Sequence, residues 1–192
     1  MDLPTGPFSL LYADPPWRFK TYSKAGLGKS ADNHYTTMSI DEMRTLPVVD
    51  IAADNSLLVM WVYDPMLLEA ISLAASWGFY NLTTVEFRWL KGNHQRLHFG
   101  LGYHTRGGGC EECWLFKRGK GLPVLSHKIR KEFYAERREH SRKPDEVRGW
   151  LVDLYGDVPR IELFARTSAP GWVSWGLENE KYQACRTECT KK

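Results

Sequence analysis

A short acidic and proline-rich motif, Asp14-Pro15-Pro16-Trp17, has residue types suited to chemistry on an aromatic amino group. Such an amine is a poor nucleophile because its lone pair is delocalised into the ring. A catalyst must therefore offer acceptors to its N–H bonds as the nitrogen becomes tetrahedral. The Asp14 carboxylate is one acceptor and the Pro15 carbonyl is a second. Because consecutive prolines fix φ and withhold N–H donors, the motif predicts a preorganised catalytic centre.

Trp17 supplies a flat aromatic face at the end of this motif. An extruded base stacked on such a face gains about 1–3 kcal/mol. The alternative is that the motif is only a tight turn with a buried anchor, since Asp and Pro are common turn formers. An apolar run ahead of Asp14 and an aromatic-rich segment with Tyr35 after Trp17 favour the catalytic interpretation.

The elements that must position this motif follow from hydrophobic patterns. Residues 8–13 form an apolar run that predicts a buried strand, which ends at Asp14 because two prolines cannot continue it. Residues 56–62 predict a second strand, residues 64–77 a helix, and residues 82–90 a strand paired directly beside the second one. This strand-helix-strand unit predicts a parallel α/β sheet. Asp14 is then expected at its carboxyl edge, where such sheets bind ligands.

Other elements follow from local signals. Ser39 and Glu42 form a capping box that predicts a short helix to Leu46, where Pro47 ends it. The remaining predicted elements are strands at 112–117 and 160–165, a helix at 143–155 and a surface loop at 22–33.

Length and composition indicate a globular chain. With 192 residues and 43% apolar residues, residues 1–180 are expected to form a single domain, followed by a polar tail at 181–192. The N-terminal residues lack a basic region followed by an apolar one, and no stretch of eighteen apolar residues occurs. We therefore expect a protein with no membrane segment, in the cytoplasm of a bacterial cell or a phage-infected host. The sequence leaves open whether the chain forms a homodimer.

Cysteines and histidines do not predict a metal site. Four cysteines, at 110, 113, 185 and 189, could together supply zinc thiolates, but one pair borders a predicted strand and the other lies in the tail. The histidines show no helical pair with a carboxylate between them. We therefore expect free thiols and no bound metal.

Positive charge is concentrated in one segment. Residues 117–148 contain eleven Lys or Arg against five Asp or Glu, whereas the whole chain has a net charge of only +3. Such a segment suits a polyanion such as nucleic acid. The alternative is a solvated charged helix at 128–140, which mixes both signs. Residues 22–33 and 94–106 are further candidate nucleic-acid contacts.

Several sequence blocks, which follow one another in the family's usual order, resemble the MT-A70-like family of adenine N6-methyltransferases. They are Leu11-Tyr12-Ala13-Asp14-Pro15-Pro16-Trp17, then Tyr35-Thr36-Thr37-Met38-Ser39, and later residues 57–62, 111–116, 140–146 and 161–166. The resemblance spans roughly residues 10–178, and the ordered set is more specific than any one motif. It implies a Rossmann-like methyltransferase sheet, permuted so that the catalytic motif precedes the cofactor-binding blocks.

The resemblance also implies a cofactor, S-adenosylmethionine, and roles for individual residues. Asp14 would contact the target amine and the amino group of the cofactor, and Lys143 would pair with the cofactor carboxylate. Further implied cofactor contacts are Glu162 and Arg166 at the ribose end, and Glu178, which follows a Gly176-Leu177 pair where the family commonly has Gly-Asn. The expected substrate contacts are Trp17, Tyr35 and Arg106.

The activity implied is adenine N6 methylation in nucleic acid. The compact chain, without appended RNA-binding modules, favours DNA over RNA, in a bacterial or phage setting. Two alternatives stay open at this point. One is a catalytically inert nucleic-acid-binding partner with the same fold, and the other is methylation of a free base, a nucleotide or a protein amide.

Overall fold

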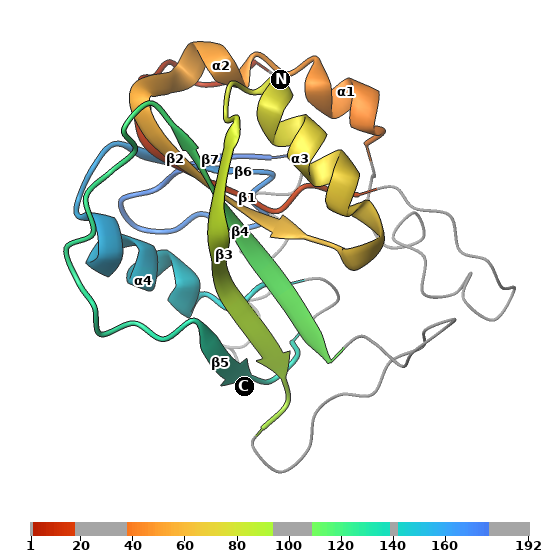
Figure 1. The fold of residues 1–192 in the computed structure, drawn as a ribbon, viewed down its shortest axis with the longest axis vertical. Helices are drawn as coiled ribbons and strands as arrows, with labels where there is room; N and C mark the ends of the chain where they lie inside the picture. Colours follow the sequence, from red (N-terminus) through yellow and green to blue (C-terminus); the bar gives the residue numbers. More distant parts are fainter. Residues whose placement is uncertain (1, 18–37, 94–108, 139–141, 177–192) are drawn as a thin grey trace, which may run out of the picture.

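A seven-stranded sheet forms the centre of the protein (Figure 1). The computed structural model describes residues 2–17, 38–93, 109–138 and 142–176. In chain order the strands are β1 (Phe8–Ala13), β2 (Ala52–Val62), β3 (Asn81–Lys91), β4 (Cys110–Arg118), β5 (Glu132–Ala135), β6 (Arg160–Leu163) and β7 (Val173–Trp175). The helices are α1 (Ile40–Arg44), α2 (Val48–Ile51), the 3-10 turn η3 (Asp64–Met66), α3 (Leu67–Ser76) and α4 (Glu146–Tyr155).

The strand order is β5-β3-β4-β2-β1-β6-β7, with β1 near the middle. Successive side chains of a strand point to opposite faces. Accordingly, Leu11 and Ala13 of β1 lie in one hydrophobic core, and Leu10 and Tyr12 lie in the other. A sheet covered on both faces requires strands that are apolar throughout, which is why residues 8–13 read as a continuous apolar run.

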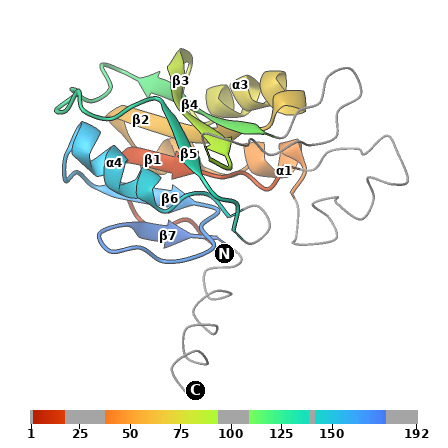
Figure 2. The same ribbon diagram turned by 90° about the horizontal axis from the view of Figure 1, so that it is seen from below.

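Helices cover both faces of the sheet (Figure 2). One core receives Met43 from α1 and Leu73 from α3, together with Val48 from α2. The other core receives Val147 and Leu151 from α4. This layered α/β architecture confirms the expected Rossmann-like fold class. In the part of the chain that the structure describes, no helix is long and apolar enough to cross a membrane.

The predicted pairing of residues 82–90 beside residues 56–62 is wrong. β4 lies between β2 and β3 and runs antiparallel to both. Cys113 and Phe116 of β4 are almost fully buried, as expected for a strand inside a sheet that is covered on both faces. The antiparallel direction brings the first residues of β4 to the edge where β1 and β2 end, since Val62 pairs with Glu112.

Several predicted elements are confirmed with shifted boundaries. The capping box is formed, because Ser39 Oγ accepts from the backbone of Glu42 at 3.2 Å and Glu42 Oε2 accepts from the backbone of Ser39 at 2.7 Å. The helix expected at 64–77 begins with η3 and continues as α3, and Gly78, at φ +88°, follows it. The helix expected at 143–155 begins only at Glu146.

The segment around residues 128–140 contains a strand and not the charged helix considered from its composition. β5 pairs in parallel with β3, with Arg88 opposite Glu132. Local charge alternation does not reveal such pairing, because the partner strand lies more than 40 residues earlier. β7 was also not predicted. The loop at 22–33 and the tail at 181–192 lie outside the described residues, and the division at residue 180 stays a prediction.

Candidate active site

The Asp14-Pro15-Pro16-Trp17 motif forms a turn directly after β1. The Asp14 backbone N–H donates to the Leu163 carbonyl of β6 at 3.4 Å, and the Trp17 N–H donates to the Pro15 carbonyl at 2.8 Å. A carbonyl oxygen has two lone pairs, so the Pro15 carbonyl can accept a second hydrogen bond. The motif thus lies at the carboxyl edge of the sheet, as expected, next to the neighbouring parallel strand β6.

Trp17 is anchored in the protein interior. Its side chain is 6% exposed, and its Nε1 donates to the backbone carbonyl of Trp61 at 3.3 Å. It belongs to the same core cluster as Met43 of α1 and Met60 of β2. The interpretation of Trp17 as a buried anchor is therefore correct. Stacking of a target base on this ring stays a prediction, and the burial of the ring argues against it.

Lys143 bridges two carboxylates at this edge. Its Nζ lies 2.9 Å from Asp14 Oδ1 and 3.2 Å from Glu111 Oε2, and 5.6 Å from the centre of the Trp61 ring. Burial by itself would lower the pKa of Lys143, but the charges of Asp14 and Glu111 outweigh it and hold that pKa above its ordinary value. Lys143 therefore stays protonated beside the Asp14-Pro15-Pro16-Trp17 motif.

Glu111 pairs with a second lysine as well as with Lys143. Its Oε1 lies 2.5 Å from Lys91 Nζ, at the end of β3. Burial would raise the pKa of Glu111, yet Lys143 and Lys91 together lower it to about 2. Sequence reasoning gave Glu111 no role, because its position at this edge depends on the antiparallel direction of β4. Its local signals were its place directly before the predicted strand at 112–117 and within the sequence block at 111–116.

Glu111 should make stability depend on pH in the acid range. Its folded pKa of about 2 lies below the ordinary value of 4.5. Its ion pairs therefore stabilise the fold fully above about pH 4.5, and this contribution is lost as the pH falls towards 2. We expect Glu111→Gln to lower the free energy of unfolding at pH 7 by about 1–3 kcal/mol, with a smaller difference from the wild type at pH 3.

Urea unfolding at the two pH values measures this difference. Asp54→Asn is the matched control, because Asp54 also pairs with a basic residue, Arg118, but its side chain is 99% exposed. We expect that control to change stability by less than about 0.5 kcal/mol. A Glu111→Gln effect of the same size at pH 3 and pH 7 would contradict the role of its charge.

A pocket opens beside Asp14, between the ends of β1 and β6 and the start of α4. The residues that line it are Tyr12, Asp14, Arg142, Lys143, Pro144, Asp145, Arg148, Glu162, Phe164, Arg166 and Thr167. Cations and carboxylates alternate around this lining. The pocket is therefore complementary to a ligand that carries both an ammonium and a carboxylate.

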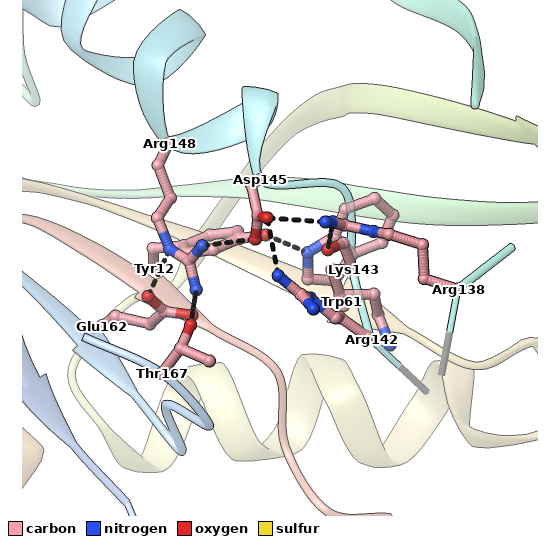
Figure 3. A network of polar contacts seen from close by, with 9 residues as sticks. All are labelled: Tyr12, Trp61, Arg138, Arg142, Lys143, Asp145, Arg148, Glu162 and Thr167. Carbon is pink, nitrogen blue, oxygen red and sulfur yellow. Dashed lines mark hydrogen bonds and ion pairs between the residues drawn. The ribbon is translucent and has the colours of Figure 1, made fainter. Parts of the chain in front are cut away.

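Glu162 is held by Arg148 in the pocket wall (Figure 3). Arg148 Nε donates to Glu162 Oε2 at 2.6 Å, Nη2 donates to Oε1 at 2.9 Å, and Nη2 also donates to Thr167 Oγ1 at 3.3 Å. Burial raises the pKa of Glu162, and the paired guanidinium opposes this shift. Arg148 was missed from the sequence, since a helix-interior arginine is usually a surface residue.

The turn after β6 also lines this pocket. Phe164 has a left-handed backbone at φ +61°, a conformation that non-glycine residues rarely adopt and that is often found at ligand sites. Behind it, a Cβ on Gly176 would lie 2.3 Å from the Ala165 carbonyl oxygen, so only glycine fits there. The tight packing of Gly176 keeps the turn that carries Arg166 and Thr167 in place.

Four predicted site residues meet around the pocket, namely Asp14, Lys143, Glu162 and Arg166. Pro15 and Pro16 lie in the turn beside it, whereas Trp17 packs into the core. Glu178, Tyr35 and Arg106 lie outside the described residues. Within the described ranges, no group of three His, Cys, Asp or Glu side chains is arranged to hold a metal ion.

Comparison with known proteins gives a family match over most of the chain. The model of the MT-A70 family matches residues 8–178. The Type II methyltransferase M.MunI of Mycoplasma sp is 32% identical, over 92% of this chain and 79% of its own length. An N(6)-adenosine-methyltransferase MT-A70-like protein of Arabidopsis thaliana is 32% identical, over 89% of this chain and 24% of its own length. The N(6)-adenine-specific methyltransferase METTL4 of Homo sapiens is 29% identical, over 92% of this chain and 38% of its own length.

This chain thus spans most of M.MunI but less than two fifths of the two eukaryotic relatives. The matched region contains the whole seven-stranded sheet and every residue that lines the pocket. The resemblance seen in the ordered sequence blocks is thereby confirmed. The chain belongs to the MT-A70 family of methyltransferases.

Proposed function

We propose that this protein transfers a methyl group from S-adenosylmethionine to the N6 amine of adenine in nucleic acid, with DNA as the favoured acceptor. The observation that carries this proposal is the juxtaposition of the Asp14 carboxylate and the Pro15 carbonyl with a pocket of alternating charge. Names of relatives in the family add support, since they include an adenine-specific and an adenosine methyltransferase. The similarity to a type II methyltransferase supports DNA.

Asp14 and the Pro15 carbonyl accept hydrogen bonds from the two N–H bonds of the target amine. These bonds become stronger as the nitrogen becomes tetrahedral and positively charged, so they stabilise the transition state more than the ground state. The donor would supply the methyl group, so that a carbon–nitrogen bond to the amine would form at the expense of the donor's carbon–sulfur bond. The surplus proton on nitrogen passes to water. Asp14 therefore needs no special basicity.

The pocket residues fit the proposed cofactor. The bound cofactor supplies an electrophilic methyl group on a positively charged sulfur, and its methionine part carries one ammonium and one carboxylate. Asp14 would pair with that ammonium and Lys143 with that carboxylate, while Glu162 and Arg166, which also line the pocket, would contact the ribose. Each Glu162 oxygen already accepts from Arg148 but retains a free lone pair.

Methyl transfer from labelled donor to DNA and RNA, followed by identification of the labelled nucleoside, tests the proposal. We expect N6-methyladenine with DNA in excess over RNA. Label found only in cytosine or in protein would overturn it. Label found in free adenine or nucleotides, with none in polymers, would instead support a small-molecule acceptor. An inert nucleic-acid-binding partner would transfer no label although it binds the polymer. Homodimer formation and a bacterial cytoplasmic location stay predictions.

Lys143→Ala should weaken cofactor binding by about 1–3 kcal/mol, the range for a hydrogen bond to a charged group. This corresponds to a roughly five- to hundred-fold change in dissociation constant. The physical reason is twofold, since the variant loses the partner of the cofactor carboxylate and leaves Asp14 and Glu111 without the cation between them. Calorimetric titration with S-adenosylmethionine measures the effect.

Lys131→Ala is the control, because Lys131 belongs to the same basic segment but contacts Thr84 on β3. We expect that variant to bind the cofactor as the wild type does. If Lys143→Ala retains full cofactor affinity and only flattens the salt dependence of nucleic-acid binding by about one unit, Lys143 contacts phosphate instead.

A further inference from the structure

Two buried tyrosine hydroxyls lie on the face of the sheet that α4 covers. Tyr12 of β1 is 2% exposed, and Tyr155, the last residue of α4, is 4% exposed. Both belong to the same hydrophobic core. A buried hydroxyl is costly in free energy unless it is hydrogen-bonded, so the partners of these two groups indicate how each is used.

The proton of Tyr155 has an acceptor within the protein. Its hydroxyl donates to Glu86 Oε1 on β3 at 2.5 Å. This hydrogen bond needs no ligand, and Tyr155 is not among the residues that line the pocket. The hydroxyl of Tyr155 is thus satisfied by the protein itself.

The proton of Tyr12, in contrast, has no acceptor in the part of the chain that the structure describes. The Tyr12 oxygen accepts from Trp61 Nε1 at 2.5 Å. An indole N–H can only donate, so this bond uses a lone pair of the Tyr12 oxygen and leaves the O–H proton for another partner. Burial raises the pKa of Tyr12 well above its ordinary value, so the proton stays on the oxygen.

The pocket is the place where this proton can find an acceptor. Tyr12 lines the pocket, and in the parallel pairing of β1 with β6 it lies directly opposite Glu162 (Figure 3). Asp14 follows two residues later along the same chain direction and also lines the pocket. Tyr12 therefore belongs to the buried floor of the pocket, between β2 and the Glu162 side.

Two aromatic neighbours hold the Tyr12 side chain in place. The indole of Trp61 donates to its oxygen, and the Trp172 ring packs against its ring edge to face, with 5.9 Å between the ring centres. Trp61 is itself almost fully buried and packs against Trp89. A donor that is fixed before the ligand arrives loses little conformational entropy on binding, which favours affinity.

We propose that the Tyr12 hydroxyl is a further cofactor contact, which accepts from Trp61 and donates its proton to a ribose oxygen of S-adenosylmethionine. The ribose is assigned because Tyr12 lies opposite Glu162, for which a ribose contact is proposed. This inference rests on the proposed function for the identity of the ligand. It adds a neutral donor to a set of proposed cofactor contacts that are otherwise charged.

Tyr12→Phe tests this inference, because it removes only the hydroxyl. We expect the affinity for S-adenosylmethionine, measured by calorimetry, to fall about three- to tenfold, as for the loss of one neutral hydrogen bond. S-adenosylhomocysteine has the same ribose but no charge on sulfur, and its affinity should fall by the same factor. A loss confined to S-adenosylmethionine would mean that the oxygen faces the sulfonium, and it would overturn the inference.

Decarboxylated S-adenosylmethionine tests the choice of the ribose. This ligand keeps the ribose but lacks the carboxylate that is assigned to Lys143. We expect Tyr12→Phe to weaken its binding by the same factor of about three to ten. If the substitution leaves the affinity for this ligand unchanged, Tyr12 donates to the carboxylate and the ribose assignment is wrong.

Tyr155→Phe is the matched control, because it removes a buried hydroxyl from the same core outside the pocket. Each substitution leaves a polar group without its partner, Trp61 Nε1 in one variant and Glu86 in the other. We expect both melting temperatures to fall by about 3–8 °C. The cofactor affinity of the control should change less than about twofold. An equal loss of affinity in both variants would mean that a loosened core explains the effect, and it would overturn the inference.

A second pair of variants avoids the unpaired indole. Trp61→Phe lacks the indole N–H but keeps the Tyr12 hydroxyl, whereas the double variant Trp61→Phe/Tyr12→Phe lacks both groups. Removing both partners of a buried hydrogen bond leaves neither of them unsatisfied. We expect the double variant to bind S-adenosylmethionine about three- to tenfold more weakly than Trp61→Phe. Equal affinities of these two variants would overturn the contact.

Failure of this inference and failure of the proposed reaction are distinguishable. A wild-type protein that binds the cofactor but methylates no adenine, with the expected loss of affinity in Tyr12→Phe, would overturn the reaction and leave the contact standing. A wild-type protein that methylates adenine, with unchanged cofactor affinity in Tyr12→Phe, would overturn only the contact.

Discussion

Asp14→Ala is expected to lower the rate of methyl transfer by about three orders of magnitude while the protein stays folded. Loss of one oriented group that stabilises developing charge typically costs a factor of 10² to 10³, and Asp14 is also placed to pair with the cofactor ammonium. The fold should persist because Lys143, the partner of Asp14, retains its contact with Glu111 at 3.2 Å. No buried cation is left unpaired by the substitution.

Transfer kinetics with labelled donor and a thermal melt of the same sample measure the two quantities. Asp157→Ala is a suitable control, since it removes an ion-paired carboxylate at the opposite end of β6. Loss of activity in step with unfolding of Asp14→Ala would favour the interpretation of the motif as a structural turn. Full activity of a folded Asp14→Ala would move the catalytic centre elsewhere.

Trp17→Ala is expected to destabilise the protein by about 3–5 kcal/mol, the usual cost of removing a buried aromatic side chain. The ring is packed in the core beside α1, and its Nε1 hydrogen bond to the Trp61 carbonyl connects the turn after β1 to β2. Loss of both contacts should lower methyl transfer through misplacement of Asp14. Urea unfolding gives the stability change, and transfer kinetics below the unfolding transition give the activity.

Trp17→Phe separates the contribution of core packing to stability from that of the Nε1 hydrogen bond. It retains most of the apolar volume and should recover more than half of the lost stability. Tyr80→Ala is the control, because Tyr80 is an aromatic residue with 78% exposure and should change stability by less than about 0.5 kcal/mol. If Trp17→Ala melts like the wild type but has a raised KM for the oligonucleotide, the ring stacks on the target base after all.

The sequence by itself determined the elements whose signals are local. The apolar run at residues 8–13 ends at two prolines, so both the strand and its last residue could be predicted. The capping box at Ser39 and Glu42 involves only residues three apart, and it is formed as expected. The ordered blocks around the Asp-Pro-Pro-Trp motif also identified the family, which the match over residues 8–178 confirms.

Four residues named from the family resemblance meet around one pocket, although they come from distant parts of the chain. Asp14 follows β1, Lys143 precedes α4, and Glu162 and Arg166 lie in and after β6. The family resemblance named all four, and the parallel pairing of β1 with β6 brings Asp14 and the β6 residues to one edge of the sheet. Their partners could not be named in this way.

Only the tertiary structure decided which strands are neighbours and which charges are paired. The insertion of β4 between β2 and β3 brought Glu111 beside Lys143, and no pattern within residues 110–118 reveals its neighbours. The burial of Trp17 and the joining of three arginines by Asp145 depend on contacts between separate elements. Hydrophobic periodicity records which face of an element is buried, but it carries no information on the element that covers that face.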